Sequence, residues 1–197
     1  MPDSLYLSLW FPEVSGPEIL PHILNVLQQF PFSAQRPGIS YIAVQPISWN
    51  ESTVLERRFS PGIAPEEAVL IATDLVHDDY AYIFDAYWDL WMPDEATRQW
   101  ALVPSPNKFI VQSQEFDEGS YEQTGHIQVD FGLDSPFLQE NVSLTEETQA
   151  KVRDNVAKLV EFTVKAEKNT RATARLLWSE SEENLAQKLI ARLQRVQ

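Results

Sequence analysis

The chain has 197 residues, of which 44% are hydrophobic, and this is enough for one globular domain with an apolar core. Its 29 acidic and 15 basic side chains give a net charge of −14, a field that repels nucleic-acid phosphates and anionic lipid. Because the chain has no cysteine, disulfides, thiolate metal sites and thiol nucleophiles are excluded.

The acidic residues are concentrated in the first three quarters of the chain. Residues 1–145 hold 21 acidic and 5 basic side chains, whereas residues 146–197 hold 8 and 10. We therefore expect a single α+β domain over residues 1–197. In it, a β-rich acidic part (1–142) carries the negative field and a helix-rich part (143–197) packs on it.

The first elements are predicted to be a strand, a helix and a second strand. Leu5–Phe11 alternates apolar and polar side chains, which is typical of a half-buried strand. Ser15–Glu18 has the spacing of a capping box, and the amphipathic helix that follows ends before Pro31. A second strand is predicted over Ile39–Trp49, and residues 50–64 resemble a polar loop.

A short helix from Pro65 to about Val76 leads into the most informative stretch, Tyr80–Trp91. These twelve residues are rich in aromatics and contain no Gly or Pro, which predicts a strand. Alternation places two different sets of side chains on its two faces. The core face carries Tyr82, Phe84, Ala86, Trp88 and Leu90, and the other face carries Ile83, Asp85, Tyr87, Asp89 and Trp91.

Three further short strands are predicted after this one. Turns at Met92–Glu95 and Pro104–Asn107 separate strands at 98–103 and 108–116, and an acidic loop leads to His126–Phe131. Connections this short join antiparallel neighbours, so we expect a meander of about four strands.

The last quarter of the chain is predicted to be mainly helical. Ser143–Glu146 has capping-box spacing and begins a long helix that reaches about Lys168. Arg171–Trp178 contains helix-favouring residues between boundary-like flanks, and we predict a strand there. Ser181 would cap a last helix, whose apolar positions are Leu185, Leu189, Ile190 and Leu193.

These elements predict an α+β fold, with a mostly antiparallel sheet, a central β-meander and helices packed on one face. A strand-helix-strand order recurs over Leu5–Trp49 and His126–Trp178, as in ferredoxin-like units. The same order is also common in α+β chains that have no such repeat.

The second face of the Tyr80–Trp91 strand is the candidate functional surface. Asp85 and Asp89 are ~13 Å apart along a strand, too far for a pair of catalytic carboxylates, so a neighbouring strand would have to supply a partner. His126–Phe131 is the candidate neighbour, because His126, Gln128 and Asp130 share one of its faces. The predicted ligand-binding residues are therefore Asp85, Tyr87, Asp89, Trp91, His126, Gln128 and Asp130, and Tyr6, Ser8, Trp10, Gln112 and Gln114 could join the same side.

Such a face would suit sugars or organic cations through stacking and acceptor-rich hydrogen bonding. The alternative is a solvated sheet face without a ligand, which commonly carries the same residue types. No metal or cofactor is expected. The three histidines, His22, His77 and His126, lack the spacing of a zinc pair, and the six glycines form no phosphate-binding loop.

The favoured function is a non-catalytic protein that binds a basic protein surface or a cationic ligand, as acidic inhibitor-type and immunity-type proteins do. One alternative is a carboxylate-dependent hydrolase of a polar small molecule or sugar, with His126 as a proton shuttle. Another is a structural or oligomeric role for residues 171–178. We expect a cytoplasmic location, with neither nucleic acid nor membrane as a partner, because no export signal or apolar span of ~20 residues is visible.

Overall fold

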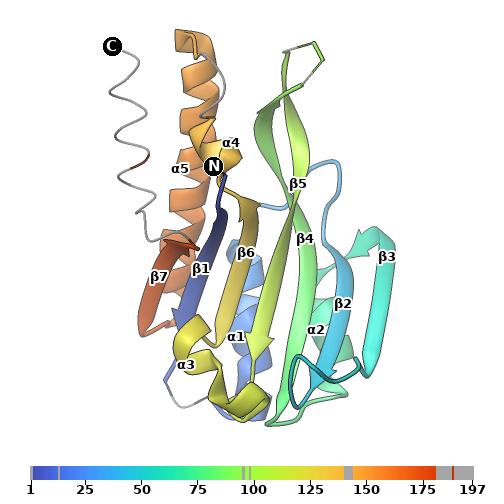
Figure 1. The fold of residues 1–197 in the computed structure, drawn as a ribbon. Helices are drawn as coiled ribbons and strands as arrows, with labels where there is room; N and C mark the ends of the chain where they lie inside the picture. Colours follow the sequence, from blue (N-terminus) through green and yellow to red (C-terminus); the bar gives the residue numbers. More distant parts are fainter. Residues whose placement is uncertain are drawn as a thin grey trace.

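The computed structural model describes residues 2–12, 14–94, 96–97, 99–139, 144–180 and 188. Seven strands form one open sheet in which all neighbours are antiparallel, in the order β3-β2-β4-β5-β6-β1-β7 (Figure 1). The strands are β1 (Ser4–Trp10), β2 (Ile39–Pro46), β3 (Leu55–Ile63), β4 (Tyr80–Pro93), β5 (Trp100–Gln112), β6 (Ile127–Leu133) and β7 (Ala174–Ser179). The α+β class and the antiparallel sheet predicted from the sequence are confirmed.

The helical elements are α1 (Gly16–Gln29), α2 (Pro65–Thr73), η1 (Phe116–Gly119), α3 (Tyr121–Thr124), α4 (Ser135–Leu138) and α5 (Glu146–Thr170). Helices α1, α2 and α5 lie together behind the sheet, and α3 lies over the lower part of its other face, which we call the open face (Figure 1). None of the helices in the described part of the chain is long and apolar enough to cross a bilayer.

The core lies between the sheet and these helices, and β4 supplies its largest side chains. Tyr82, Phe84 and Trp88 are fully buried, as alternation along this strand predicts. The Trp88 ring stacks on Phe30 at 5.5 Å and on Phe131 at 5.2 Å, measured between ring centroids. The buried Trp88 indole of β4 therefore packs against the end of α1 and against β6.

Strand β4 is longer than its neighbour β2, which pairs with it only as far as Ala86. Backbone groups of β4 beyond that point would have no partner on this edge, and burying them unpaired would be costly. Side chains and a loop take the place of the missing strand. Ser33 N donates to Tyr87 O at 2.7 Å, Lys158 Nζ donates to Asp89 O, and the Asn155 amide pairs with both N and O of Trp91 at 2.8 and 2.9 Å.

The connections at the two ends of the chain each join strands that run in the same direction without being neighbours. Helix α1 links β1 to β2, and helix α5 links β6 to β7, with β1 lying between β6 and β7. The predicted strand-helix-strand order is present at both ends, and the weakly marked strand over 171–178 is confirmed as β7. The ferredoxin-like description of these units stays a prediction.

Two predictions in the middle of the chain are wrong. Part of the polar loop expected over 50–64 is the edge strand β3, and the turn expected at Pro104–Asn107 is part of one continuous strand, β5. Strand β6 pairs with β5 only from Lys108 onward, so the edge of β5 at Pro104 and Pro106 faces no strand. The missing proline N–H groups therefore cost no sheet hydrogen bond.

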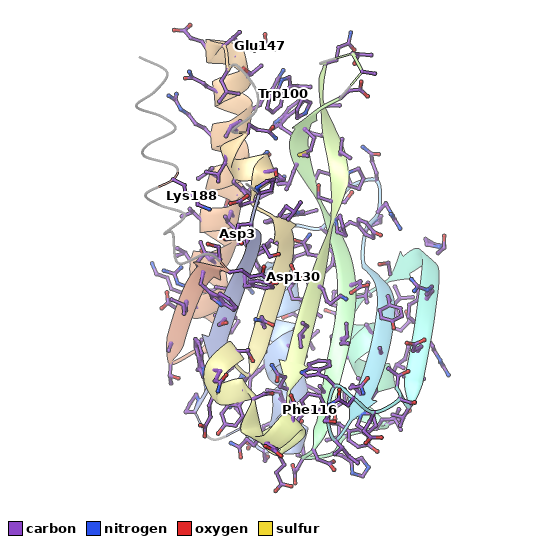
Figure 2. The ribbon with its side chains drawn as sticks, in the orientation of Figure 1. Asp3, Trp100, Phe116, Asp130, Glu147 and Lys188 are labelled. Carbon is purple, nitrogen blue, oxygen red and sulfur yellow. The ribbon has the colours of Figure 1, made fainter. Side chains whose placement is uncertain are left out.

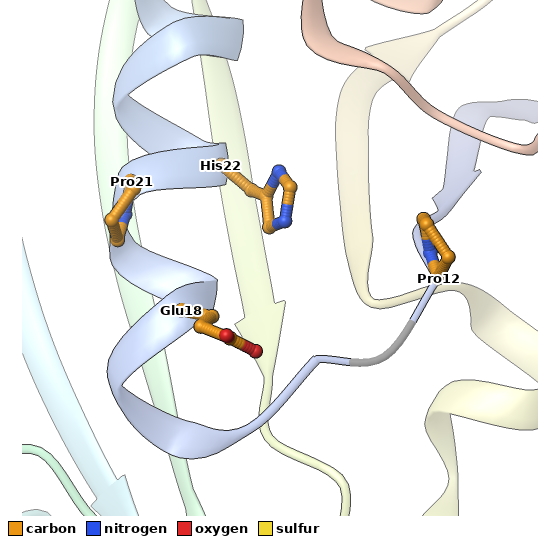
Figure 3. Close-up of a pocket in the computed structure, with 4 residues that line it drawn as sticks. All are labelled: Pro12, Glu18, Pro21 and His22. Atoms are coloured by element: carbon orange, nitrogen blue, oxygen red, sulfur yellow. The ribbon is translucent and has the colours of Figure 1, made fainter.

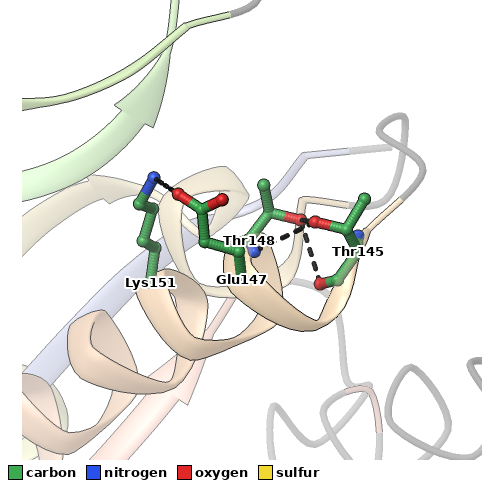
Figure 4. A network of polar contacts seen from close by, with 4 residues as sticks. All are labelled: Thr145, Glu147, Thr148 and Lys151. Atoms are coloured by element: carbon green, nitrogen blue, oxygen red, sulfur yellow. Dashed lines mark hydrogen bonds and ion pairs between the residues drawn. The ribbon is translucent and has the colours of Figure 1, made fainter.

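Helix α5 begins two residues later than the predicted capping box. Its N-cap is Thr145, whose side chain and that of Thr148 bond reciprocally to each other's backbone N–H groups (Figure 4). One turn further on, Lys151 Nζ lies 2.8 Å from Glu147 Oε1. Ser143, Ser181 and the four predicted apolar positions of a last helix lie outside the described residues.

We predict that Asn155→Ala destabilises the protein by about 2–3 kcal/mol, because it leaves the Trp91 N–H, the Trp91 carbonyl and the Pro136 carbonyl without this partner. Urea denaturation would measure the change. Asn169→Ala on the same helix is the control, since Asn169 is exposed, and it should cost less than about 0.5 kcal/mol. Equal effects of the two substitutions would contradict the role of Asn155 at the β4 edge.

Candidate functional site

Strand register aligns one line of side chains across the whole open face of the sheet. Paired residues of antiparallel strands point to the same side, so each pairing carries the line one strand further. In strand order from β3 to β7, the line contains Arg58, Tyr41, Asp85, Lys108, Asp130, Tyr6 and Trp178. We call these seven residues the transverse row. Asp130 lies about midway along this face (Figure 2).

The centre of the transverse row is a lysine between two carboxylates. Lys108 pairs directly with Asp85 on one side and with Asp130 on the other. Asp130 Oδ1 accepts a hydrogen bond of 2.8 Å from Gly132 N. In contrast, Asp85 Oδ1 is buried and accepts no hydrogen bond from the described residues. A buried carboxylate oxygen without a donor is an unsatisfied group, and such groups are uncommon in folded proteins.

The environment of Asp85 disfavours its charged form. Burial raises the pKa of the Asp85 carboxyl, the Lys108 and Arg58 charges oppose this rise, and the nearby Asp130 charge adds to it. The two cations therefore do not fully compensate for the loss of water. A further hydrogen-bond donor or cation at Asp85 would stabilise the carboxylate.

A small cavity opens at this position. It has a volume of about 190 Å³ and is lined by Asp85, Pro106, Asn107, Lys108, Asp130 and Gly132. Pockets for small molecules usually measure about 300–1,000 Å³, so this cavity is too small for most of them. It has room for the end of one side chain.

Aromatic rings flank the two carboxylates on both sides. Next to Asp130, the Tyr6 and Trp178 rings stack with centroids 4.6 Å apart, and Trp178 Nε1 donates to Ser8 Oγ at 3.0 Å. Next to Asp85, the Arg58 guanidinium lies over the Tyr41 ring at 4.8 Å. Rings beside carboxylates form a surface that attracts cations, through cation–π contact as well as charge.

The end of the open face that is lowest in Figure 1 is covered by the chain itself. Segment 116–124, which contains η1 and α3, lies over it, and Trp10 Nε1 donates to Tyr121 O at 3.0 Å. Ser8 Oγ donates to Thr124 O at 2.7 Å, and Gln112 Nε2 donates to Thr124 Oγ1 at 2.7 Å. Gln128 pairs with Ser8 and Ile110 and is 9% exposed. Gln128 is thus next to the transverse row but nearly closed to solvent.

Three other predicted site residues already have partners within the protein. The Arg36 guanidinium lies 3.6 Å from the centroid of the Tyr87 ring. The Asp89 carboxylate accepts hydrogen bonds from Ser33 Oγ and Ala34 N, and it thereby fixes the loop that follows α1. The Trp91 ring is covered by Lys151 of α5 at 5.3 Å. These contacts hold the β4 edge and do not converge on Asp85.

His126 lies apart from the carboxylates, in a buried aromatic stack. Its ring is 4.4 Å from that of Tyr121 and 6.4 Å from that of Phe11, and its Nδ1 accepts a hydrogen bond of 3.1 Å from Phe11 N. Its Nε2 is buried without a hydrogen-bond partner among the described residues. Burial, with a smaller contribution from His22, lowers the pKa of His126 to about 4.

The structure therefore brings Asp85, Asp130 and Gln128 to one part of the sheet and places Tyr87, Asp89, Trp91 and His126 elsewhere. Strands β4 and β6 are not neighbours, because β5 lies between them. Sequence reasoning missed Lys108, Tyr41, Arg58 and Trp178. Alternation through Lys108, Ile110 and Gln112 was a signal for the lysine, but the supposed turn before it hid the register of β5.

A second cavity, of about 320 Å³, lies beside the start of α1 and is lined by Pro12, Glu18, Pro21 and His22 (Figure 3). The Glu18 carboxylate accepts a hydrogen bond from Ser15 N at 3.1 Å, and the His22 ring stacks on Phe11 at 4.3 Å. Burial lowers the pKa of His22. Glu18 thus caps the helix, whereas His22 Nδ1 is buried without a hydrogen-bond partner among the described residues. The described residues contain no group of three or more metal ligands.

In comparisons with known proteins, no protein-family model matches the chain, and no curated protein or solved structure matches it significantly.

We predict that His126 makes the protein less stable as the pH falls. Its pKa is about 4 when folded and 6.5 ordinarily, so the unfolded chain takes up a proton that the folded protein excludes. The free energy of unfolding should begin to fall near pH 6.5, and at pH 4 the loss due to His126 should be about 3 kcal/mol. Denaturation at several pH values would measure the free energy of unfolding of the wild type and of His126→Asn. The asparagine amide oxygen can still accept the hydrogen bond from Phe11 N, and the variant should show the shallower pH dependence. Both proteins contain the same carboxylates, so the titration of these groups affects both equally. Equal pH dependence of the free energy of unfolding in the two proteins would therefore contradict the prediction.

Proposed function

We propose that this is a non-catalytic binding protein that uses the transverse row to bind a basic surface of another protein or a cationic ligand. The observation that carries the proposal is Asp85, whose Oδ1 is buried at a cavity without a hydrogen-bond donor. Leaving such an atom unsatisfied costs about 1–3 kcal/mol. Once the exposed Lys108 side chain moves aside, a guanidinium or ammonium group supplied by a partner can reach this atom and remove that cost.

The surroundings of Asp85 support a cationic partner. Asp85 and Asp130 provide two carboxylates, and the aromatic rings of Tyr41, Tyr6 and Trp178 lie beside them. Lys108 is exposed, so its ammonium group can move toward solvent when another cation enters. Residues 1–145 carry 21 acidic and only 5 basic side chains, and this field would speed the approach of a basic protein.

The geometry supports binding better than hydrolysis. Asp85 and Asp130 are two strand spacings apart, roughly 10 Å, and Lys108 lies between them. His126 is 4% exposed, and burial lowers its pKa to about 4, so it is a weak base and closed to substrate. The 190 Å³ cavity also suits one side chain better than a sugar ring bound in a pocket.

The proposed location, the lack of a cofactor and the excluded partners are inferred from the sequence. We propose that the protein acts in the cytoplasm, without a cofactor, and that neither nucleic acid nor a membrane surface is its partner. The net charge of −14 supports the exclusion of both anionic surfaces.

We predict that Asp85→Asn strengthens the fold and weakens binding. Replacing a desolvated carboxylate by a neutral amide should raise the free energy of unfolding by about 1 kcal/mol at pH 7. Because the folded pKa is raised, this gain should decline as the pH falls and the wild-type carboxyl becomes protonated. Affinity for an arginine-rich peptide, measured by titration calorimetry at low salt, should fall at least tenfold, which is about 1.4 kcal/mol.

Asp130→Asn should weaken the same binding, whereas Asp154→Asn on the exposed side of α5 should leave it unchanged. Binding to the wild type should also weaken as salt is added. An arginine-rich peptide that fails to bind, or that binds equally to all three variants, would overturn the proposal.

A further inference from the structure

Three large apolar side chains are exposed on the loop between β2 and β3. Ile47, Trp49 and Val54 are 57%, 43% and 50% exposed. The Trp49 ring meets the fully buried Phe116 ring edge-on, with the ring centroids 4.8 Å apart. Figure 2 marks Phe116 at this end of the sheet and Trp100 at the opposite end. Clustered exposed apolar side chains are typical of contact sites for other proteins.

Hydrogen bonds hold this loop in one conformation. The Gln45 amide donates to Ser48 O at 2.8 Å and to Glu51 O, and Val54 N donates to Val44 O at 2.9 Å. The loop is therefore ordered before any partner arrives, and binding would cost little conformational entropy.

Ile47 joins this loop to two other segments at a cost in backbone strain. Its N donates to Asp79 O and its O accepts from Asp117 N, both at 2.7 Å. Its φ is +62°, which is unfavourable for a β-branched residue and usual for glycine or asparagine. Since its side chain is mostly exposed, the core does not require isoleucine at this position.

The three segments that meet at this loop carry charge of one sign. The segments that meet there, 47–54, 74–80 and 113–122, contain no lysine or arginine. Glu51 and Glu118 are exposed, and Asp117 is half-buried. An apolar group surrounded by carboxylates is complementary to a surface in which lysine or arginine surrounds an apolar side chain.

We infer that Ile47, Trp49, Val54, Glu51, Asp117 and Glu118 form a docking surface for a basic segment of another protein that also presents an apolar side chain. We call these residues the end surface. The apolar side chain packs on Trp49 and Ile47, and the basic side chains pair with the surrounding carboxylates. Because it uses different residues, this inference does not depend on the function proposed for the transverse row.

Three synthetic peptides of equal length test the end surface by titration calorimetry. One combines arginine with leucine, one combines arginine with serine, and one combines glutamate with leucine. The arginine–leucine peptide should bind at least tenfold more tightly than either of the others, because it alone matches both the charge and the apolar group.

Ile47→Asn separates stability from binding. Asparagine tolerates a positive φ, so the melting temperature should rise by about 2–4 °C. Affinity for the arginine–leucine peptide should nevertheless fall at least fivefold. Leu102→Asn, which changes another exposed apolar residue two positions after Trp100 in β5, should leave the affinity unchanged.

Glu118→Lys should weaken the same binding at least tenfold, and Asp154→Lys on α5 should change it less than twofold. The inference is overturned if the arginine–serine peptide binds as tightly as the arginine–leucine peptide, or if Ile47→Asn and Glu118→Lys behave like their controls. Loss of binding in Asp85→Asn alone would also overturn it and would assign the peptide to the transverse row.

Discussion

The rest of the structure depends on β4 and on the need to satisfy both its faces and its free edge. Its alternating sequence buries Tyr82, Phe84 and Trp88 against the helices, which directs Asp85 to the opposite face. Past the end of β2, its unpaired backbone groups must find other partners. Asn155 supplies one set of them, so the same requirement also positions α5.

This arrangement explains how an unfavourable carboxylate can be held in place. The core side chains fix the register of β4, and the register then fixes which residues of β5 and β6 stand beside Asp85. A strand cannot slip by one residue without turning Trp88 out of the core. The energy stored at Asp85 is small compared with the burial of these aromatic side chains, so the fold tolerates it.

Patterns within single elements were readable from the sequence, whereas relations between strands were not. The two faces of β4, the helix α1 and the strand β7 follow from local alternation, spacing and boundary residues. Edge strand β3 was hidden by its Arg57-Arg58 pair and Pro61-Gly62, which look like loop residues, and β5 was hidden by its prolines. For the site, alternation identified Asp85 and Asp130, but the position of Lys108 between them depends on strand order, which no local pattern encodes.

The place of β1 between β6 and β7 has a consequence for biosynthesis. Leu9 pairs with Ile127 on one side and with Arg175 on the other, so β1 is enclosed by two strands that are synthesised much later than β1 itself. Until then its fully buried residues, Leu5 and Leu7, have no sheet to join on the growing chain. Contacts this distant along the chain slow folding, and the Tyr6–Trp178 end of the transverse row can form only after residues 174–179 have left the ribosome.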